Sequence, residues 1–391
     1  MTRKIVPEGV DAVLADAVAA GQVPHVVAIA ADADGVFYEG AAGVRVVGEG
    51  EDPVSGSTHF AVMSMTKIIT TTAALQQVER GELDLDAPVE QYLPEFAQVQ
   101  VLTGFDGDTP LYEAPAVRPT VQHLMTHTAG LGYWFWSKDL VDFERATGTP
   151  NVVPGTMAAF DAPMVVQPGT EFVYGINTDW LGRVVEAVAG QGLDEVLRDN
   201  ITGPLGMDDT MFVLDDARRA NCVTVHVKGE DGAWTSAGEI LNQEPEWFAG
   251  GHGLYSTPRD YVRFTQALLR GGELDGQRIL SPETVETAFT NQIGDLGFPE
   301  EIPTADPATS DTLRVGPGHT WGHGLLLNTD DVPGGRRAGT GAWAGLFNTH
   351  FFIDRTTGIT ASIYSNTLPF ASEQDAWKLY GDFEKALYAA L

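Results

Sequence analysis

The feature that most constrains the fold is a pair of expected β-strands at each end of the chain. Residues 26–31 and 35–40 are short apolar runs on either side of an Asp-Ala-Asp-Gly turn, and residues 346–353 and 358–364 flank an Asp-Arg-Thr-Thr turn. Runs of this length between turn residues are typical of paired strands. The sequence therefore predicts one antiparallel sheet that is assembled from both ends of the chain.

Helices are expected outside and between these strands. Apolar residues recur at helical spacing in residues 10–18 and 374–391, and Gly21 follows the first of these helices. Residues 101–119 and 294–317 contain Pro and Gly and are expected to be long loops. The middle of the chain contains four further predicted helices, at residues 66–79, 120–124, 180–189 and 193–199. This order indicates an α+β fold with a helical insertion rather than a repeated β-α-β unit.

Composition and charge limit the classes of protein that remain. A chain of 391 residues with 43% hydrophobic residues can bury a large core. Its net charge of −31 disfavours nucleic acid and anionic membrane surfaces as partners, and an anionic substrate would need a local positive charge. No secretory signal and no apolar run of roughly 18 residues is evident, so a cytoplasmic protein is expected. The single cysteine, Cys222, allows no internal disulfide and agrees with a reducing compartment.

A serine and a lysine lie three residues apart in Ser64-Met65-Thr66-Lys67, at the start of a predicted helix. Residues at this spacing share a helix face, so the Lys67 amine can reach the Ser64 hydroxyl. A serine hydroxyl is a weak nucleophile until a base activates it. Lys67 can be that base only if its pKa falls by about 3 units, which burial at a helix N-terminus favours. A surface serine that caps the helix, followed by a solvated lysine, is the alternative interpretation.

Two other segments carry chemistry that a serine nucleophile needs. Tyr174 precedes a predicted helix, and its phenol can transfer protons as a general base and acid; aromatic packing is the alternative role. Asn177 can contact a substrate or cap the helix that follows. The small residues from Gly339 to Phe347 lead into a strand, where an N–H can bind an oxyanion together with that of Ser64. A tight hairpin is the alternative interpretation of that run.

These segments together resemble the serine β-lactamase-like superfamily, and within it the family VIII carboxylesterases, which are similar to class C β-lactamases. Ser64-x-x-Lys67 matches the nucleophile motif, and Tyr174 matches the tyrosine of the second motif. Residues 124–131 (LMTHTAGL) resemble the L-L-T-H-T-S-G-L segment of the family, and residues 250–257 (GGHGLYST) resemble its Gly-rich L-Y-S-T segment. Order, spacing and chain length agree, so the resemblance spans nearly the whole sequence.

The resemblance implies one catalytic unit over residues 1–391 with a β-lactamase/penicillin-binding-protein-like fold. An α/β subdomain would consist of about residues 1–62 and 205–391. The remaining part, about residues 63–204, would form a mostly helical subdomain.

The resemblance also assigns roles within the site and identifies departures from β-lactamases. Leu346, which follows Trp343-Ala344-Gly345, would supply the second oxyanion N–H. β-Lactamases of this type carry Tyr-x-Asn, whereas Asn177 lies one residue later, which puts its role as a substrate ligand in doubt. They also carry Lys-Thr-Gly on the strand beside the site, where this chain resembles the Trp-Gly-Gly of family VIII esterases. Without that lysine a neutral ester is the expected substrate.

Other chemistries lack their motifs. No Gly-x-Ser-x-Gly is present, which excludes the α/β-hydrolase nucleophile elbow. His123 and His127 are spaced by four, but no intervening Glu or third ligand completes a zinc motif, so both are interpreted as structural and no metal is expected. No phosphate- or dinucleotide-binding motif occurs, so no cofactor is expected. Residues 133–136 (YWFW) are four aromatics that either line an acyl pocket or anchor a loop, and Trp134 is a candidate substrate contact.

The sequence thus predicts a cytoplasmic serine carboxylesterase for short-chain acyl esters. Ser64 would form the acyl-enzyme, Lys67 and Tyr174 would transfer protons, and Trp343, Ala344, Gly345, Asn177 and Trp134 would contact the substrate. A β-lactamase, a D-amino-acid peptidase or an acyltransferase on the same scaffold is the nearest alternative, and a catalytically silent binding module is the alternative of another class. The expected partner is a small-molecule ester; a monomer and a homodimer are both left open.

Overall fold

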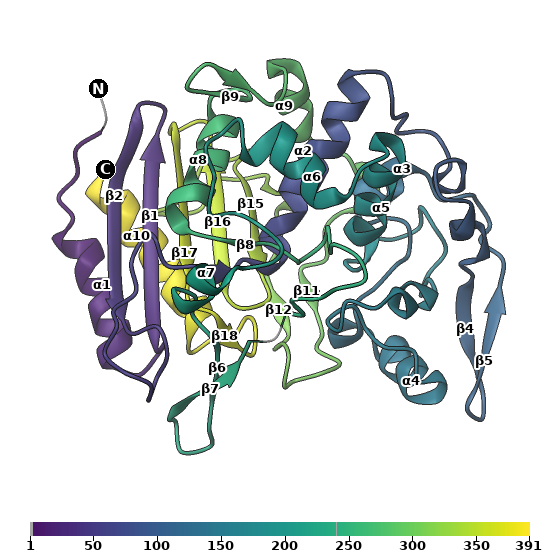
Figure 1. Ribbon diagram of the computed structural model, residues 1–391, viewed down its shortest axis with the longest axis horizontal. Coiled ribbons are helices and arrows are strands. Elements are labelled where there is room, and N and C mark those ends of the chain that lie inside the picture. The colour runs from purple at the N-terminus through teal and green to yellow at the C-terminus, as the bar shows by residue number, and fades with distance from the viewer. Residues whose placement is uncertain (1–2, 240) are drawn as a thin grey trace.

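Seven antiparallel strands form the central sheet, and they come from the two ends of the chain (Figure 1). The computed structural model describes residues 3–239 and 241–391. The strand order is β13 (His319–Trp321), β14 (Leu326–Asn328), β15 (Gly341–Gly345), β16 (Thr349–Asp354), β17 (Ile359–Tyr364), β1 (His25–Asp32) and β2 (Gly35–Gly43). Ile29 of β1 lies opposite Ser362 of β17, so the two chain ends pair directly. The predicted α+β fold is confirmed.

Helices cover both faces of this sheet. On β1, Ala28 and Ala30 pack into a core with α1 (Glu8–Ala19) and α10 (Ala376–Ala390), while Val27 and Ile29 pack into the opposite core. Successive strand residues point to opposite faces, so this strand is apolar on both faces from Val26 to Ala31. The opposite core includes α8 (Pro258–Leu269) and α2 (Thr66–Glu79) and continues into the helical region. In Figure 1, α1 and α10 lie together at the left edge of the view.

The middle of the chain forms the mostly helical right half of Figure 1. Its helices are α3 (Val121–Met125), α4 (Lys138–Thr147), α5 (Asn177–Ala189) and α6 (Leu193–Leu197). Single helical turns occupy Met63–Met65, Val89–Gln91, Pro94–Gln98, Trp134–Trp136, Met157–Asp161, Arg198–Thr202 and, later in the chain, Gly294–Leu296. Two short helices, α7 (Asp216–Ala220) and α9 (Pro282–Ala288), flank α8 in the sequence. The subdomain division at about residues 62 and 205 stays a prediction.

The remaining strands form small separate sheets. They pair as β3 (Phe60–Ala61) with β8 (Tyr255–Ser256), β4 (Val101–Asp106) with β5 (Thr109–Glu113), β9 (Glu273–Leu274) with β10 (Gln277–Arg278), β11 (Glu301–Ile302) with β12 (Leu313–Arg314), and β6 (Val225–Lys228) with both β7 (Trp234–Gly238) and β18 (Thr367–Leu368). In the described part of the chain, no helix combines the length and the apolar character that crossing a membrane requires.

Three expectations about local structure were wrong. The segment 294–317 is not a loop throughout, because it contains the helical turn Gly294–Leu296 and the paired strands β11 and β12. Residues 101–119 are not a loop throughout, because β4 and β5 form a hairpin around Gly107 and Asp108, where Gly107 has φ +63°. The strand expected from Leu346 begins only at Thr349, because residues 346–348 form the turn between β15 and β16. Asn348 adopts φ +57° in this turn. Leu346 therefore lies at the end of a strand rather than inside one.

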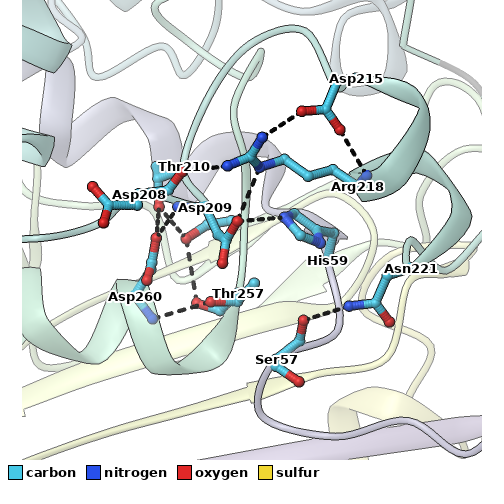
Figure 2. A network of polar contacts seen from close by, with 11 residues as sticks. Ser57, His59, Asp208, Asp209, Thr210, Asp215, Arg218, Asn221, Thr257 and Asp260 are labelled. Atoms are coloured by element: carbon cyan, nitrogen blue, oxygen red, sulfur yellow. Dashed lines mark hydrogen bonds and ion pairs between the residues drawn. The ribbon is translucent and has the colours of Figure 1, made fainter.

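A polar network fixes the segment that leads into β3 (Figure 2). The His59 ring approaches the Asp209 carboxylate at 3.6 Å, and the Arg218 guanidinium donates to the same carboxylate at 2.9 Å. The Asp209 backbone N–H donates to Asp260, in the first turn of α8, at 2.7 Å. The Asn221 amide donates to the Ser57 carbonyl at 2.8 Å. These contacts fix the segment that precedes Ser64 against elements that lie about 150 to 200 residues later in the sequence.

Candidate active site

Ser64 lies in a single helical turn, Met63–Met65, between β3 and α2. β3 is held by its pairing with β8, where Ala61 lies opposite Tyr255. Met63 has φ +47°, a conformation that costs free energy for a residue with a side chain and that is common beside functional groups. Ser64 is 8% exposed, so its hydroxyl is largely enclosed but reachable.

Lys67 lies at the second position of α2 and is almost completely buried. Its Nζ donates to Ser64 Oγ at 3.1 Å, to Tyr133 OH at 2.9 Å and to the Gly251 carbonyl at 2.8 Å. These three acceptors account for all three N–H bonds of an ammonium group. The predicted contact between Lys67 and Ser64 is therefore present, and the surface interpretation of this motif is wrong.

The environment of Lys67 makes it a base at neutral pH. Burial lowers its pKa to about 7, and the Asp179 carboxylate opposes that shift by favouring the ammonium form. The N-terminus of α2 adds a positive partial charge that also disfavours an ammonium. A substantial fraction of Lys67 is therefore a neutral amine near pH 7, within reach of the serine proton.

Two tyrosines flank the lysine. Its Nζ lies 4.7 Å from the Tyr174 ring centre and 5.0 Å from the Tyr133 ring centre. The Tyr174 hydroxyl accepts a hydrogen bond from Trp343 Nε1 at 2.7 Å, and a contact with Ser64 also affects its titration. Burial raises the pKa of both phenols, so both are protonated at neutral pH. Tyr174 is thus suited to donate a proton, whereas the neutral Lys67 amine is the better base.

Tyr133 and Asp179 belong to this cluster but were not predicted as catalytic or positioning residues. Asp179 is fully buried in the first turn of α5; its Oδ2 accepts from Tyr133 OH at 3.3 Å and its Oδ1 accepts from the Gly251 N–H at 2.8 Å. His252 Nδ1 lies 3.4 Å from the same oxygen. A Cβ atom on Gly251 would lie 2.5 Å from Asp179 Oδ2, which explains a glycine here. The available sequence signal for Asp179 was that it lies five residues after Tyr174.

We expect Asp179→Asn to move the ascending limb of the pH profile of kcat/KM to lower pH. The asparagine oxygen can still accept from Gly251, but the charge that favours protonated Lys67 is lost, so the pKa of Lys67 should fall further. A decrease of about half to one pH unit is expected in the midpoint. Ester turnover measured from pH 5 to 9 tests this. The exposed Asp161→Asn variant is the control, and an unmoved limb in Asp179→Asn would contradict the role.

The small-residue strand β15 presents an open edge beside Ser64. β14 pairs only with Gly341 and Ala342, so the edge is free of strand pairing on that side from Trp343 onward. A Cβ atom on Gly345 would lie 2.3 Å from the Val62 carbonyl oxygen, which shows how closely β15 approaches the nucleophile turn. Among the hydrogen bonds of the described residues, none is formed by the N–H of Ser64 or of Leu346. The oxyanion role of these two N–H groups stays a prediction.

Asn177 and Trp134, two of the predicted substrate contacts, have their hydrogen-bond partners outside the cluster around Ser64. Asn177 is the first residue of α5 rather than its cap and is fully buried, with its amide on the Leu131 carbonyl and the His127 ring. This placement argues against the expected substrate contact. Trp134 is half-buried, and its Nε1 donates to Asp306 at 3.3 Å. It anchors the aromatic turn, and its contact with a substrate stays a prediction.

The two histidines have roles within the fold. His123 completes a capping box at the start of α3 with Thr120. His127 is buried, and its ring lies 4.6 Å from that of Tyr174. Burial and the nearby Lys67 hold its pKa well below the usual value, so the ring is neutral. His127 therefore supports Tyr174 by packing.

A sequence model of the protein family described as Beta-lactamase matches residues 10–384. The chain belongs to the beta-lactamase family. Among curated relatives, this beta-lactamase-family protein is 36% identical to lovastatin esterase of Penicillium rubens over 362 residues, which are 88% of each chain. It is 31% identical to monacolin J acid methylbutanoyltransferase of Aspergillus terreus, over 95% of this chain and 93% of the relative.

Solved structures agree with this family membership. Unliganded simvastatin synthase from Aspergillus terreus has a TM-score of 0.80 and 27% sequence identity, with 97% of each chain covered. Family, relatives and structure together identify a serine hydrolase or acyltransferase of the beta-lactamase fold.

Proposed function

We propose that this beta-lactamase-family protein is a cytoplasmic serine carboxylesterase, similar to family VIII esterases, that hydrolyses short-chain acyl esters. The observation that carries the proposal is the buried Lys67 amine 3.1 Å from Ser64 Oγ, with a pKa of about 7. The neutral triplet Trp343-Ala344-Gly345 supports an ester rather than a lactam, because it offers no strand lysine to a lactam carboxylate.

Acylation uses the groups of this cluster in turn. Neutral Lys67 accepts the Ser64 proton while Ser64 Oγ attacks the ester carbonyl carbon. The N–H groups of Ser64 and Leu346 hold the negative oxygen of the tetrahedral intermediate. Tyr174 gives its proton to the leaving alcohol oxygen as the C–O bond breaks, and the Lys67 ammonium restores that proton.

Deacylation follows the same route in reverse. Water adds to the acyl carbonyl carbon and loses a proton through Tyr174 and Lys67, and Ser64 Oγ regains a proton as it leaves. An alcohol in place of water would give acyl transfer. The methylbutanoyltransferase among the relatives favours this as the second candidate activity.

Three measurements separate these activities: turnover of an ester, turnover of a lactam, and ester turnover with an added alcohol. We expect turnover of p-nitrophenyl butyrate with a covalent butyryl adduct on Ser64, and a kcat/KM for nitrocefin at least about 100-fold lower, because a lactam carboxylate has no cation on the strand. Added alcohol that diverts the butyryl group to a new ester would assign acyltransferase activity. Nitrocefin turnover equal to ester turnover would contradict the esterase proposal, and failure of a fluorophosphonate probe to label Ser64 would favour a silent binding module.

A further inference from the structure

A cavity of about 230 Å³ adjoins the open edge of β15. It lies between the α10-facing side of the sheet and the start of α10, and its wall includes Ala344, His350, Phe370, Trp377 and Tyr380. A water molecule takes up about 30 Å³ of liquid, so the cavity has room for a ring or a branched chain. Its aromatic wall suits an apolar group of this kind.

The two charged groups in this wall, Arg314 and Arg336, are both basic, in a chain of net charge −31. Arg314, Arg336, His319 and His350 line the cavity, and among the described residues no aspartate or glutamate does so. Burial lowers the pKa of both histidines, and the Arg336 charge lowers each further, so both rings are neutral. The carboxylates that bind the arginines lie outside the wall: Glu384 for Arg336, and Glu301 and Glu373 for Arg314.

Arg336 is held with one side of its guanidinium unoccupied. Its Nη1 donates to Tyr380 OH and lies 3.4 Å from Glu384 Oε2. Within the described chain, Nε and Nη2 form no hydrogen bond, and the Arg336 side chain keeps 14% of its surface exposed. These two N–H groups form the side of a guanidinium that binds a carboxylate through two parallel hydrogen bonds.

Trp343 links the wall of the cavity to the cluster around Ser64. Trp343 and Ala344, on the strand edge beside Ser64, contribute to its wall, and Trp343 Nε1 donates to Tyr174 OH. Trp136 lies 5.6 Å from the Tyr174 ring and 6.1 Å from the Phe370 ring, between centres. We therefore expect an ester bound at Ser64 to direct one of its substituents toward this cavity.

We propose that this cavity binds a carboxylate carried by the substrate, with Arg336 holding the carboxylate and the aromatic wall holding the adjoining apolar group. The inference rests on the proposed ester hydrolysis and adds a substrate class to it: esters with a second, free carboxylate. Arg336 supplies the local positive charge that an anionic substrate of so acidic a protein requires.

Matched esters and variants test the role of Arg336. We compare 3-butyryloxybenzoate, with the carboxylate on the alcohol side, and mono-p-nitrophenyl glutarate, with the carboxylate on the acyl side, each against its neutral methyl ester. Arg336→Gln should lower kcat/KM about 10- to 100-fold for one of the two anions and change the neutral esters less than two-fold. Arg337→Gln, a neighbour that binds Asp331 outside the cavity, should change neither. An equal loss on charged and neutral esters would overturn the proposal.

Ligand binding to the unaltered protein gives a second test that needs neither a folded variant nor turnover. Calorimetry with 4-phenylbutyrate and the neutral 4-phenylbutyramide should show at least 10-fold tighter binding of the carboxylate. Equal or weaker binding of the carboxylate would overturn the proposal. Tight carboxylate binding without any ester turnover would instead refute only the esterase function.

Discussion

Replacement of Ser64 with alanine should lower kcat/KM for p-nitrophenyl butyrate by at least about 10³-fold. The hydroxyl is the atom that bonds to the acyl group, and Lys67 Nζ, at 3.1 Å, has no other nucleophile of this kind to activate in the cluster. Alanine removes one buried acceptor from Lys67 but leaves Tyr133 and the Gly251 carbonyl in place. The fold should therefore persist.

The measurement combines steady-state turnover with intact-protein mass. Wild type should gain the mass of one butyryl group when quenched during turnover, and Ser64→Ala should gain none. Ser57→Ala, at an exposed serine of the preceding segment, is the control and should keep both properties. Turnover by Ser64→Ala above a hundredth of the wild-type value would contradict the proposed acyl-enzyme on Ser64.

Lys67→Met should lower activity by a similar factor, about 10³-fold, while changing how stability depends on pH. In the folded protein the pKa of Lys67 is about 7 against an ordinary value of 10.5, so the unfolded chain binds one more proton than the folded protein between these two pH values. Wild-type stability should therefore rise through this window, by up to about 1.4 kcal/mol per pH unit and about 5 kcal/mol in total. Below pH 7 the buried ammonium costs wild type this free energy, and methionine avoids that cost.

Denaturant unfolding at pH 6, 7.5 and 9 tests this prediction. The free energy of unfolding of Lys67→Met relative to wild type should fall steadily from pH 7 upward. Lys385→Met, at an exposed position of α10, should give a constant difference across the same range. A difference in the free energy of unfolding between Lys67→Met and wild type that does not change with pH would mean that the lysine keeps its ordinary pKa. That result would contradict the proposal that Lys67 is the base.

The sequence predicted those parts of the site that depend on local geometry. Ser64 and Lys67 are three residues apart on one helical segment, so their contact required only that α2 begin where the apolar pattern starts. Tyr174 was predicted by its motif. The pairing of both chain ends followed from short apolar runs and turns.

Contacts between distant segments could not be predicted in the same way. Tyr133 is one of four consecutive aromatic residues, and nothing in the sequence indicates that its hydroxyl contacts Lys67. That contact forms only in the folded protein, because the two residues are 66 positions apart. Asp179 acquires its role because Gly251, 72 residues later, lies against it. The β4–β5 hairpin differs, since its two-residue loop Gly107-Asp108 is a recognised hairpin signal that the Pro and Gly content of the region obscured.

The backbone of Gly251 joins both halves of the catalytic cluster, through its carbonyl to Lys67 and through its N–H to Asp179. Lys67 is separated from Gly251 by 184 residues of chain. During synthesis, Ser64 and Lys67 emerge long before the segment that completes their surroundings. Until that segment docks, the lysine remains solvated and protonated, and the serine is an ordinary alcohol. The chain thus acquires its reactive nucleophile only when segments 184 residues apart have come together.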